Sequence, residues 1–238
     1  MIIKLEQLLL TTSKPIEALT FFIGEGYQEI FSCHIQNPLI KKDFMKAYSA
    51  YHTIHYLKKT DFFNIEIITY DHQGHYHSSF VPRMKLTGRQ KSIMDNYTSS
   101  SIAFEPLNEG DQAMPLFLRL KTSNERESHV FWETVGFKSV TDSLDTDPRQ
   151  FSFISPFHRD VIIEFEKGNH ESLVYLDDEG WTSLAFLSSN LEKDHAFFLK
   201  RGFLPSKITE LEVNKKRIRI FFIRDPGVVI IEFLSASL

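Results

Sequence analysis

The sequence contains a single cysteine, Cys33, among 238 residues, so the chain cannot build a framework of disulfide bonds. This scarcity fits a protein that works in a reducing compartment, and we expect a cytoplasmic location. The sequence also lacks a C-x-x-C motif, a glycine-rich phosphate loop and the G-x-S-x-G turn of serine hydrolases. The familiar motifs of redox, nucleotide and hydrolase chemistry are therefore absent.

Strong net charge and long apolar runs are absent as well. The formal net charge is -4 at pH 7, which gives no general reason to bind nucleic acid or an anionic membrane. The apolar run near the N-terminus is too short to span a bilayer, contains Glu6 and lacks a cleavage site of small residues. It predicts a strand, and we expect neither nucleic acid nor membrane as a partner.

A repeated pattern is the main feature that the sequence does contain. Residues 115–137 (PLFLRLKTSNERESHVFWETVGF) align with residues 181–203 (WTSLAFLSSNLEKDHAFFLKRGF), without a gap over their second halves. In each copy an apolar run is followed by a helix-like stretch that ends at Gly-Phe, as expected where a left-handed glycine stops a helix. Further strands follow, and VIIEF ends both copies.

Each copy therefore reads strand, helix, strand, strand, strand over about 60 residues. We predict unit two at residues 111–168, unit three at 175–238, and a divergent unit one at 1–71. Residues 72–110 match no copy and carry turn signals, which indicates a linker or an insertion.

Local signals place the helices within these units. Ser189 with Glu192 has the spacing of a capping box, and Gly202 suits the end of the helix that follows. Pro15 suits the first turn of an earlier helix. We expect helices at residues 15–24, 125–135 and 191–201.

Repeated βαβββ units with an aromatic pair before Gly-Phe and a closing IIEF resemble the vicinal oxygen chelate superfamily. This group includes glyoxalase I, extradiol dioxygenases, fosfomycin-resistance and bleomycin-resistance proteins. The resemblance covers residues 111–238 well and 1–71 less well. It implies an α+β fold in which two units pair mixed, curved sheets into a cup, with the helices outside. In active members a divalent metal lies at the floor of the cup, held by residues of the first and last strands.

The resemblance implies which residues occupy those floor positions here. The last strands offer Glu66, Glu164 and Glu232, whereas counting back from the helical aromatics gives Gln7, Phe117 and Ser183 on the first strands.

The short linker between units two and three, residues 166–180, favours these two units as the cup. Their pair contributes Glu164 and Glu232 but no nitrogen ligand, since Phe117 cannot bind a metal and Ser183 is a poor ligand. We therefore favour no metal cofactor. If unit one pairs with unit two, three oxygen ligands meet instead; a divalent metal, if bound, is expected among Gln7, Glu66, Glu164 and Glu232.

The carboxylates of this cup carry a separate expectation. Glu164 and Glu232 should face each other across its floor, and burial together with repulsion should raise at least one carboxyl pKa. His52 and His55 are three residues apart on a predicted strand, so they should point to opposite faces.

Three functions from different classes remain open. The first is a metal-free protein that binds a small apolar or aromatic molecule, with Glu164, Glu232, Phe117 and Ser183 as pocket candidates. The second is a metal-dependent isomerase, lyase or dioxygenase, and the third is a structural or interaction protein whose own side chains fill the cup. The missing nitrogen ligands favour the first function, for which no catalytic residue is assigned. Assembly into a homo-oligomer is compatible with all three.

Overall fold

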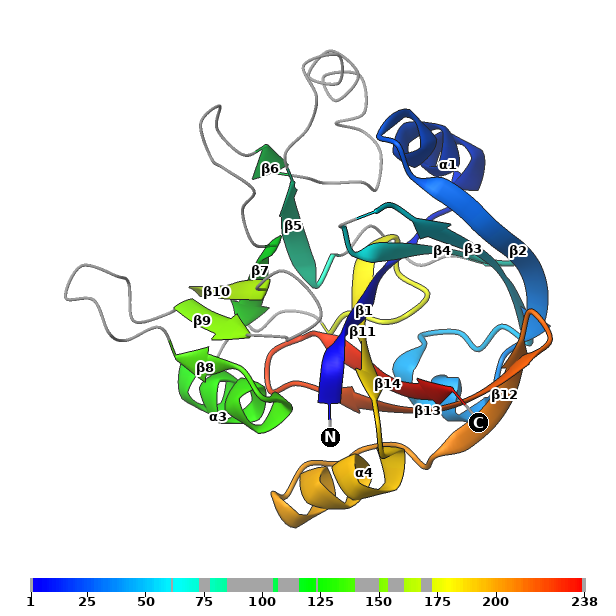
Figure 1. Ribbon diagram of the computed structural model, residues 1–238. Coiled ribbons are helices and arrows are strands. Elements are labelled where there is room, and N and C mark those ends of the chain that lie inside the picture. Colours follow the sequence, from blue (N-terminus) through cyan, green and yellow to red (C-terminus); the bar gives the residue numbers. More distant parts are fainter. Residues whose placement is uncertain are drawn as a thin grey trace.

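A strongly curved eight-stranded sheet joins unit one to unit three (Figure 1). The computed structural model describes residues 2–60, 62–72, 78–84, 105–106, 116–122, 124–139, 150–153, 161–167 and 173–236. Within this part of the chain, the strand order of the sheet is β12-β13-β14-β11-β1-β4-β3-β2. The observed architecture is the predicted α+β cup with helices on its outside.

Each half of this sheet is built from one unit. Unit one supplies β1 (Ile2–Thr11), α1 (Pro15–Gly24), β2 (Gln28–Gln36), the 3-10 helix η1 (Leu39–Phe44), β3 (Tyr51–Lys58) and β4 (Asn64–Tyr70). Unit three supplies β11 (Gly180–Ser188), α4 (Leu191–Lys200), β12 (Thr209–Val213), β13 (Lys216–Arg224) and β14 (Ile230–Ala236).

Strands β1 and β11 join the two halves as an antiparallel pair in which Leu8 lies opposite Leu184. Within each half the first strand also pairs in parallel with the last, β1 with β4 and β11 with β14. The halves therefore repeat one topology about a pseudo-twofold axis near the Leu8–Leu184 pair.

Unit two lies in a separate six-stranded sheet of order β6-β5-β7-β10-β9-β8. Its elements are β7 (Leu116–Thr122), α3 (Glu125–Val135), β8 (Lys138–Ser139), β9 (Gln150–Phe153) and β10 (Val161–Lys167). The sheet also includes β5 (Phe80–Met84) and β6 (Glu105–Pro106), which come from the segment between units one and two.

The expected pairing of units two and three is therefore wrong. Strand β5 pairs antiparallel with β7, so the edge of unit two that could meet another first strand is already taken. Strand β11 keeps its corresponding edge and pairs with β1. The cup belongs to units one and three, while the boundaries assigned to the three units remain a prediction.

The helices form where the sequence predicts them, at α1, α3 and α4. The last one differs in its cap, because Asn190 rather than Ser189 is the N-cap and accepts a hydrogen bond from the Lys193 amide at 2.9 Å. Asn124 makes the equivalent bond to the Glu127 amide at 3.2 Å. An asparagine oxygen thus satisfies a free amide at both helix starts.

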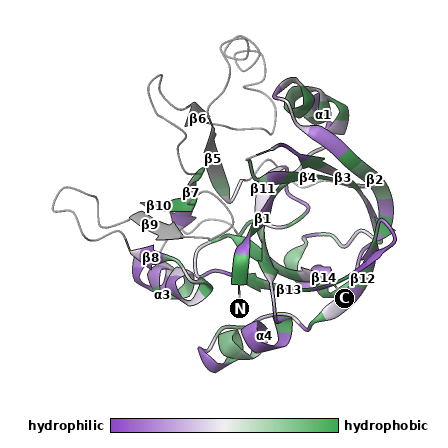
Figure 2. Ribbon diagram, viewed as in Figure 1, coloured by the Kyte–Doolittle hydropathy of each residue, from purple (hydrophilic) through white to green (hydrophobic). Residues whose placement is uncertain are grey.

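Two apolar clusters lie on opposite faces of the large sheet. The larger one packs α1, α3 and α4 against the outer face and includes Phe131, Trp132 and Phe198. The smaller one lies inside the arc, where Phe44 and Met45 of the β2–β3 connection pack on the sheet. Figure 2 shows hydrophilic residues along the outer strands β2 and β12 and on the exposed faces of the helices. No helix in the described ranges is long and apolar enough to cross a membrane.

Candidate functional site in the cup

The floor of the cup carries Gln7 on β1, Glu66 on β4, Ser183 on β11 and Glu232 on β14. All four are buried. Side chains two residues away on these strands, such as Leu9 and Ala185, belong to the apolar cluster inside the arc. Because alternate residues of a strand share one face, the four polar side chains face the inside of the cup.

Sheet register relates these residues in pairs. Leu9 lies beside Glu66, and Ala185 lies beside Glu232. Ser183 lies two residues before Ala185, as Gln7 lies two residues before Leu9. The Gln7 amide Nε2 donates a hydrogen bond to Glu66 Oε2. Serine therefore occupies in unit three the place that glutamine occupies in unit one.

The structure does not bring Glu164 and Phe117 to this floor. Both lie in the six-stranded sheet, on β10 and β7. The half-buried Glu164 has Oε2 at 4.0 Å from Arg119 Nε. The prediction that Glu164 and Glu232 line one floor is wrong, because β5 holds unit two in another sheet. The side chain of Phe117 lies outside the described part of the structure.

Lys41 is a site residue that the sequence analysis missed. It comes from η1 in the β2–β3 connection, and the residue is only 6% exposed. Its Nζ lies 3.4 Å from Nε2 of His52, a buried residue of β3. His55 instead bonds to Glu29 at 2.7 Å, so the predicted opposite orientation of the two histidines is confirmed. In sequence, Lys41 next to Lys42 and Asp43 looks like ordinary solvated charge.

Burial and mutual charge shift the protonation of the floor. Burial, and then the neighbouring Glu232 carboxylate, raise the pKa of Glu66 to about 8, against the opposing effects of Lys41 and Gln7. Burial raises the pKa of Glu232 to about 6, and Lys41 opposes this shift. A raised carboxyl pKa was expected, but the interacting pair is Glu66 with Glu232. Burial therefore disfavours the ionised form of both carboxyl groups.

The neighbouring bases and acids are also perturbed. Burial lowers the pKa of Lys41, while Glu232 and Glu66 act to raise it. Burial, followed by Lys41 and His34, lowers the pKa of His52 to about 2, so this imidazole is neutral. Burial, helped by Glu66, Asp177 and Glu232, raises the pKa of Tyr70 well above its ordinary value.

Buried polar atoms near this floor have no hydrogen-bond partner among the described residues. They are Ser183 Oγ, Tyr70 Oη and His52 Nδ1. The rings of His52 and Tyr70 lie next to each other, with centroids 5.5 Å apart. Buried polar atoms without a hydrogen-bond partner are uncommon in proteins, so a ligand or solvent molecule is the expected partner of each one. Tyr70 shares a strand face with Glu66, so strand periodicity could have indicated it from sequence.

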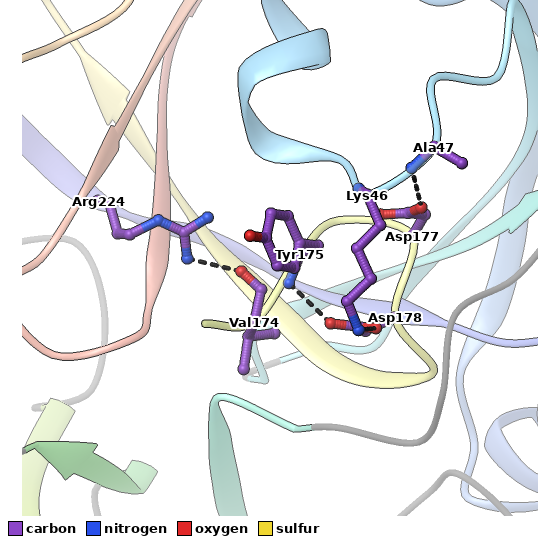
Figure 3. A network of polar contacts seen from close by, with 7 residues as sticks. All are labelled: Lys46, Ala47, Val174, Tyr175, Asp177, Asp178 and Arg224. Carbon is purple, nitrogen blue, oxygen red and sulfur yellow. Dashed lines mark hydrogen bonds and ion pairs between the residues drawn. The ribbon is translucent and has the colours of Figure 1, made fainter. Parts of the chain in front are cut away.

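Residues 37–50, which we call the plug segment, cross the cup and are tied to the turn before β11. Asp177 accepts hydrogen bonds from the amides of Lys46 at 2.8 Å and Ala47 at 3.0 Å. The bond from Ala47 can be followed in Figure 3. Lys46 Nζ pairs with Asp178 at 2.6 Å. The Leu176 amide donates to the Phe44 carbonyl at 2.8 Å.

A groove of about 850 Å³ abuts the plug segment from outside. Its lining includes Phe44, together with Arg126, Arg201 and Arg224. The guanidinium group of Arg224 already donates one hydrogen bond to the Val174 carbonyl, at 2.6 Å. Phe44 thus belongs both to the groove and to the cluster inside the cup.

The floor does not fit a transition metal that prefers nitrogen ligands, such as Zn²⁺ or Ni²⁺. Gln7, Glu66 and Glu232 offer oxygen donors only, and the fourth position holds the alcohol of Ser183. The Lys41 side chain adds a positive charge that acts on both carboxylates. Among the described residues, no group of three or more His, Cys, Asp or Glu is placed to hold a metal ion.

Comparison with solved structures identifies the architecture. No family model matches the sequence, and no curated protein matches it. Glyoxalase I from Zea mays superimposes with a TM-score of 0.57 at 12% identity, covering 98% of this chain and 92% of the maize chain. Its V278E mutant gives a TM-score of 0.60 at the same identity and coverages. The chain has the glyoxalase I fold. This agreement over nearly the whole length confirms the fold of the vicinal oxygen chelate proteins that the repeats predict.

Proposed function

We propose that this glyoxalase-like chain binds a small organic molecule in the cup of units one and three, without a metal. The observation that carries the proposal is the group of buried, unpartnered polar atoms on Ser183, Tyr70 and His52 beside the two carboxyl groups. Such atoms destabilise a fold unless something satisfies them, so unpartnered groups on several strands that line the cup support a binding site there.

The polar atoms define the chemistry of the ligand. Lys41 Nζ approaches His52 Nε2, so this nitrogen accepts and the ring proton of the neutral imidazole lies on Nδ1. His52 Nδ1 is therefore a donor, and the hydroxyls of Tyr70 and Ser183 can also donate. The proposed ligand carries acceptor oxygens, such as those of a carbonyl or carboxyl group.

The walls of the cup define the rest of the ligand. The cluster inside the arc is apolar and includes Leu9, Ile68 and Phe222. Small-molecule sites typically combine apolar walls with a few polar groups that orient the ligand. A small aliphatic or aromatic body with one polar end matches this surface.

Access to the floor involves the plug segment. Phe44 contacts both the outer groove and the interior cluster, and hydrogen bonds to Asp177 and Leu176 hold the segment. We propose that the ligand enters from the groove as this segment moves aside. Packing of the segment inside the cup is also what a purely structural protein would show, so ligand binding decides between the two functions.

The test is a screen of small aliphatic and aromatic carbonyl and carboxyl compounds against chelator-treated protein, read by thermal shift and by changes in NMR spectra. Hits should lose affinity in Ser183→Ala and Tyr70→Phe. Tyr27→Phe is the matched control, because the Tyr27 hydroxyl is also buried and unpartnered but lies in the outer core cluster. Hits that respond equally to all three variants, or no hits in a screen of that chemistry, would contradict binding at the floor.

A further inference from the structure

We propose that the Lys41 ammonium group takes the place of a divalent metal on the floor of the cup. The positive charge near Glu66 and Glu232 is then supplied by a side chain of the protein and not by a bound ion. This inference does not depend on the identity of any ligand, and it shares with the proposed function only the premise that no metal is bound at the floor.

The position of Lys41 is the first argument. Lysine is among the residue types least often buried, unless its charge is paired. Here the residue is 6% exposed, with Nζ at 3.4 Å from His52 Nε2 inside the arc of the sheet. Glu66 and Glu232 both interact electrostatically with Lys41. One cation therefore acts on two carboxyl groups that come from symmetry-related strands.

The second argument is that the position is built into the fold. The plug segment is closed at its base, where Asn37 Nδ2 donates to the Ser49 carbonyl at 2.8 Å and the Tyr48 hydroxyl donates to the Asn37 carbonyl at 2.7 Å. Asp177 and Leu176 hold its far side. Lys41 lies between these anchors in the sequence, and its buried side chain reaches Nε2 of His52.

The third argument concerns charge and donors together. The floor offers the amide of Gln7 and the carboxyl groups of Glu66 and Glu232 as possible metal ligands. The fourth position holds Ser183, whose hydroxyl is a weak metal ligand. A divalent ion placed among these groups would lack a nitrogen ligand and would also be repelled by the ammonium group. The lack of a nitrogen ligand at Ser183 and the buried cation of Lys41 are two independent features of this chain, and both act against metal binding.

Metal titration of engineered variants tests this inference. We compare the wild-type protein with Lys41→Met, Ser183→His and the double variant K41M/S183H, all treated with chelator and then titrated with Zn²⁺ or Ni²⁺ by calorimetry. Wild-type protein should bind no stoichiometric metal. The double variant should bind about one ion per chain, roughly 10–100-fold more tightly than Ser183→His alone, because the added ligand then meets no competing ammonium group.

Two controls define the site of binding. Adding Glu232→Gln to the double variant should abolish the gained affinity, whereas Glu164→Gln in the other sheet should leave it intact. The inference fails if wild-type protein binds one ion per chain tightly, or if Lys41→Met does not strengthen metal binding in the Ser183→His background.

A second measurement covers the case in which these variants do not fold. The pair Lys41→Gln and Glu232→Gln, singly and together, removes each charge in turn and should show non-additive changes in the midpoint of thermal unfolding if the side chains interact across the floor. Additive changes would overturn the inference, since they would show that Lys41 is buried without serving as the counter-charge of Glu232.

Discussion

Glu66 and Glu232 occupy equivalent places on β4 and β14, each beside the first strand of its own unit, and their carboxyl groups interact across the floor of the cup. The equivalence follows from the antiparallel pairing of β1 with β11, which places the two units about one pseudo-twofold axis. The interaction makes the protonation of the floor depend on pH in the neutral range.

The pH dependence of folding stability should therefore change in Glu66→Gln. Burial and Glu232 raise the pKa of folded Glu66 to about 8 from an ordinary value of 4.5. The stabilising contribution of its proton is complete below about pH 4.5 and disappears as the pH rises to about 8. The side-chain amide of the variant has no proton to lose, so the part of the fall in unfolding free energy with pH that Glu66 causes should disappear. At pH 9 the variant should be more stable than the wild type by on the order of 2–4 kcal/mol.

Urea unfolding between pH 5 and pH 9 measures this effect. Glu164→Gln, in the six-stranded sheet, is the matched control and should keep the wild-type slope. A Glu66→Gln protein with an unchanged slope would mean that another group governs stability in this range.

The tie between the plug segment and unit three gives a second prediction. Asp177→Ala removes the acceptor of the Lys46 and Ala47 amides, so the segment should open more often. We expect a loss of about 2–3 kcal/mol in stability, since hydrogen bonds to a charged acceptor are lost. Hydrogen exchange should become faster in residues 44–50 and remain unchanged in β13.

Glu179→Ala, two residues further along the chain, serves as the comparison for this variant. Glu179 accepts one exposed hydrogen bond from the Ser13 amide at 3.2 Å, and its removal should cost less than about 1 kcal/mol. Equal exchange rates in the two variants would show that Asp177 does not hold the segment.

A third prediction concerns the contact between the two sheets. The Trp132 indole on α3 donates to Asp225 Oδ2 at 3.3 Å, and the Val229 amide donates to Oδ1 at 2.8 Å. Burial raises the pKa of Asp225 to about 7, and these hydrogen bonds oppose the shift. Trp132→Phe should raise this pKa further, because a donor to the ionised form is lost.

NMR titration of the carboxyl carbon of Asp225 measures this shift. Trp132→Phe should also lower stability by about 1–3 kcal/mol through the lost hydrogen bond and the space left in the core. In Phe131→Leu, which changes a neighbouring buried ring without touching the hydrogen bond, the pKa of Asp225 should stay near the wild-type value. A pKa unchanged in Trp132→Phe would rule out the indole as a donor to the carboxylate.

Much of the fold follows from short-range patterns in the sequence. The three helices and the last strands of units two and three, which both contain IIEF, form where periodicity and glycine signals predict them. At the start of α4 the sequence analysis placed the cap at Ser189, whereas the N-cap is Asn190. The repeat aligns Asn190 with Asn124, the N-cap of α3, and could have indicated the correct residue. Positions such as Glu66, Gln7 and Ser183 were found because the repeat fixes their place on each strand.

The pairing of the units could not be read in this way. Linker length favoured units two and three, but β5 occupies the edge of β7. Pro82 lies within β5, and a proline inside such a short run argues against a strand in a sequence-based reading. Lys41 and Asp177 lie in connections, where a charged residue normally predicts solvent exposure, and only the tertiary structure turns them inward.

The β1–β11 pair also governs the order in which the molecule can be assembled. Strand β1 lies in the middle of the sheet, yet its partner is encoded in the last third of the chain, with Ile2 opposite Ser188. During synthesis most of the polypeptide must be made before β11 can pair with the free backbone N–H and C=O groups along this edge of β1. Contacts between such distant segments slow folding and prolong the exposure of unpaired strands to aggregation. The pairing that creates the cup therefore cannot form until β11 has been synthesised.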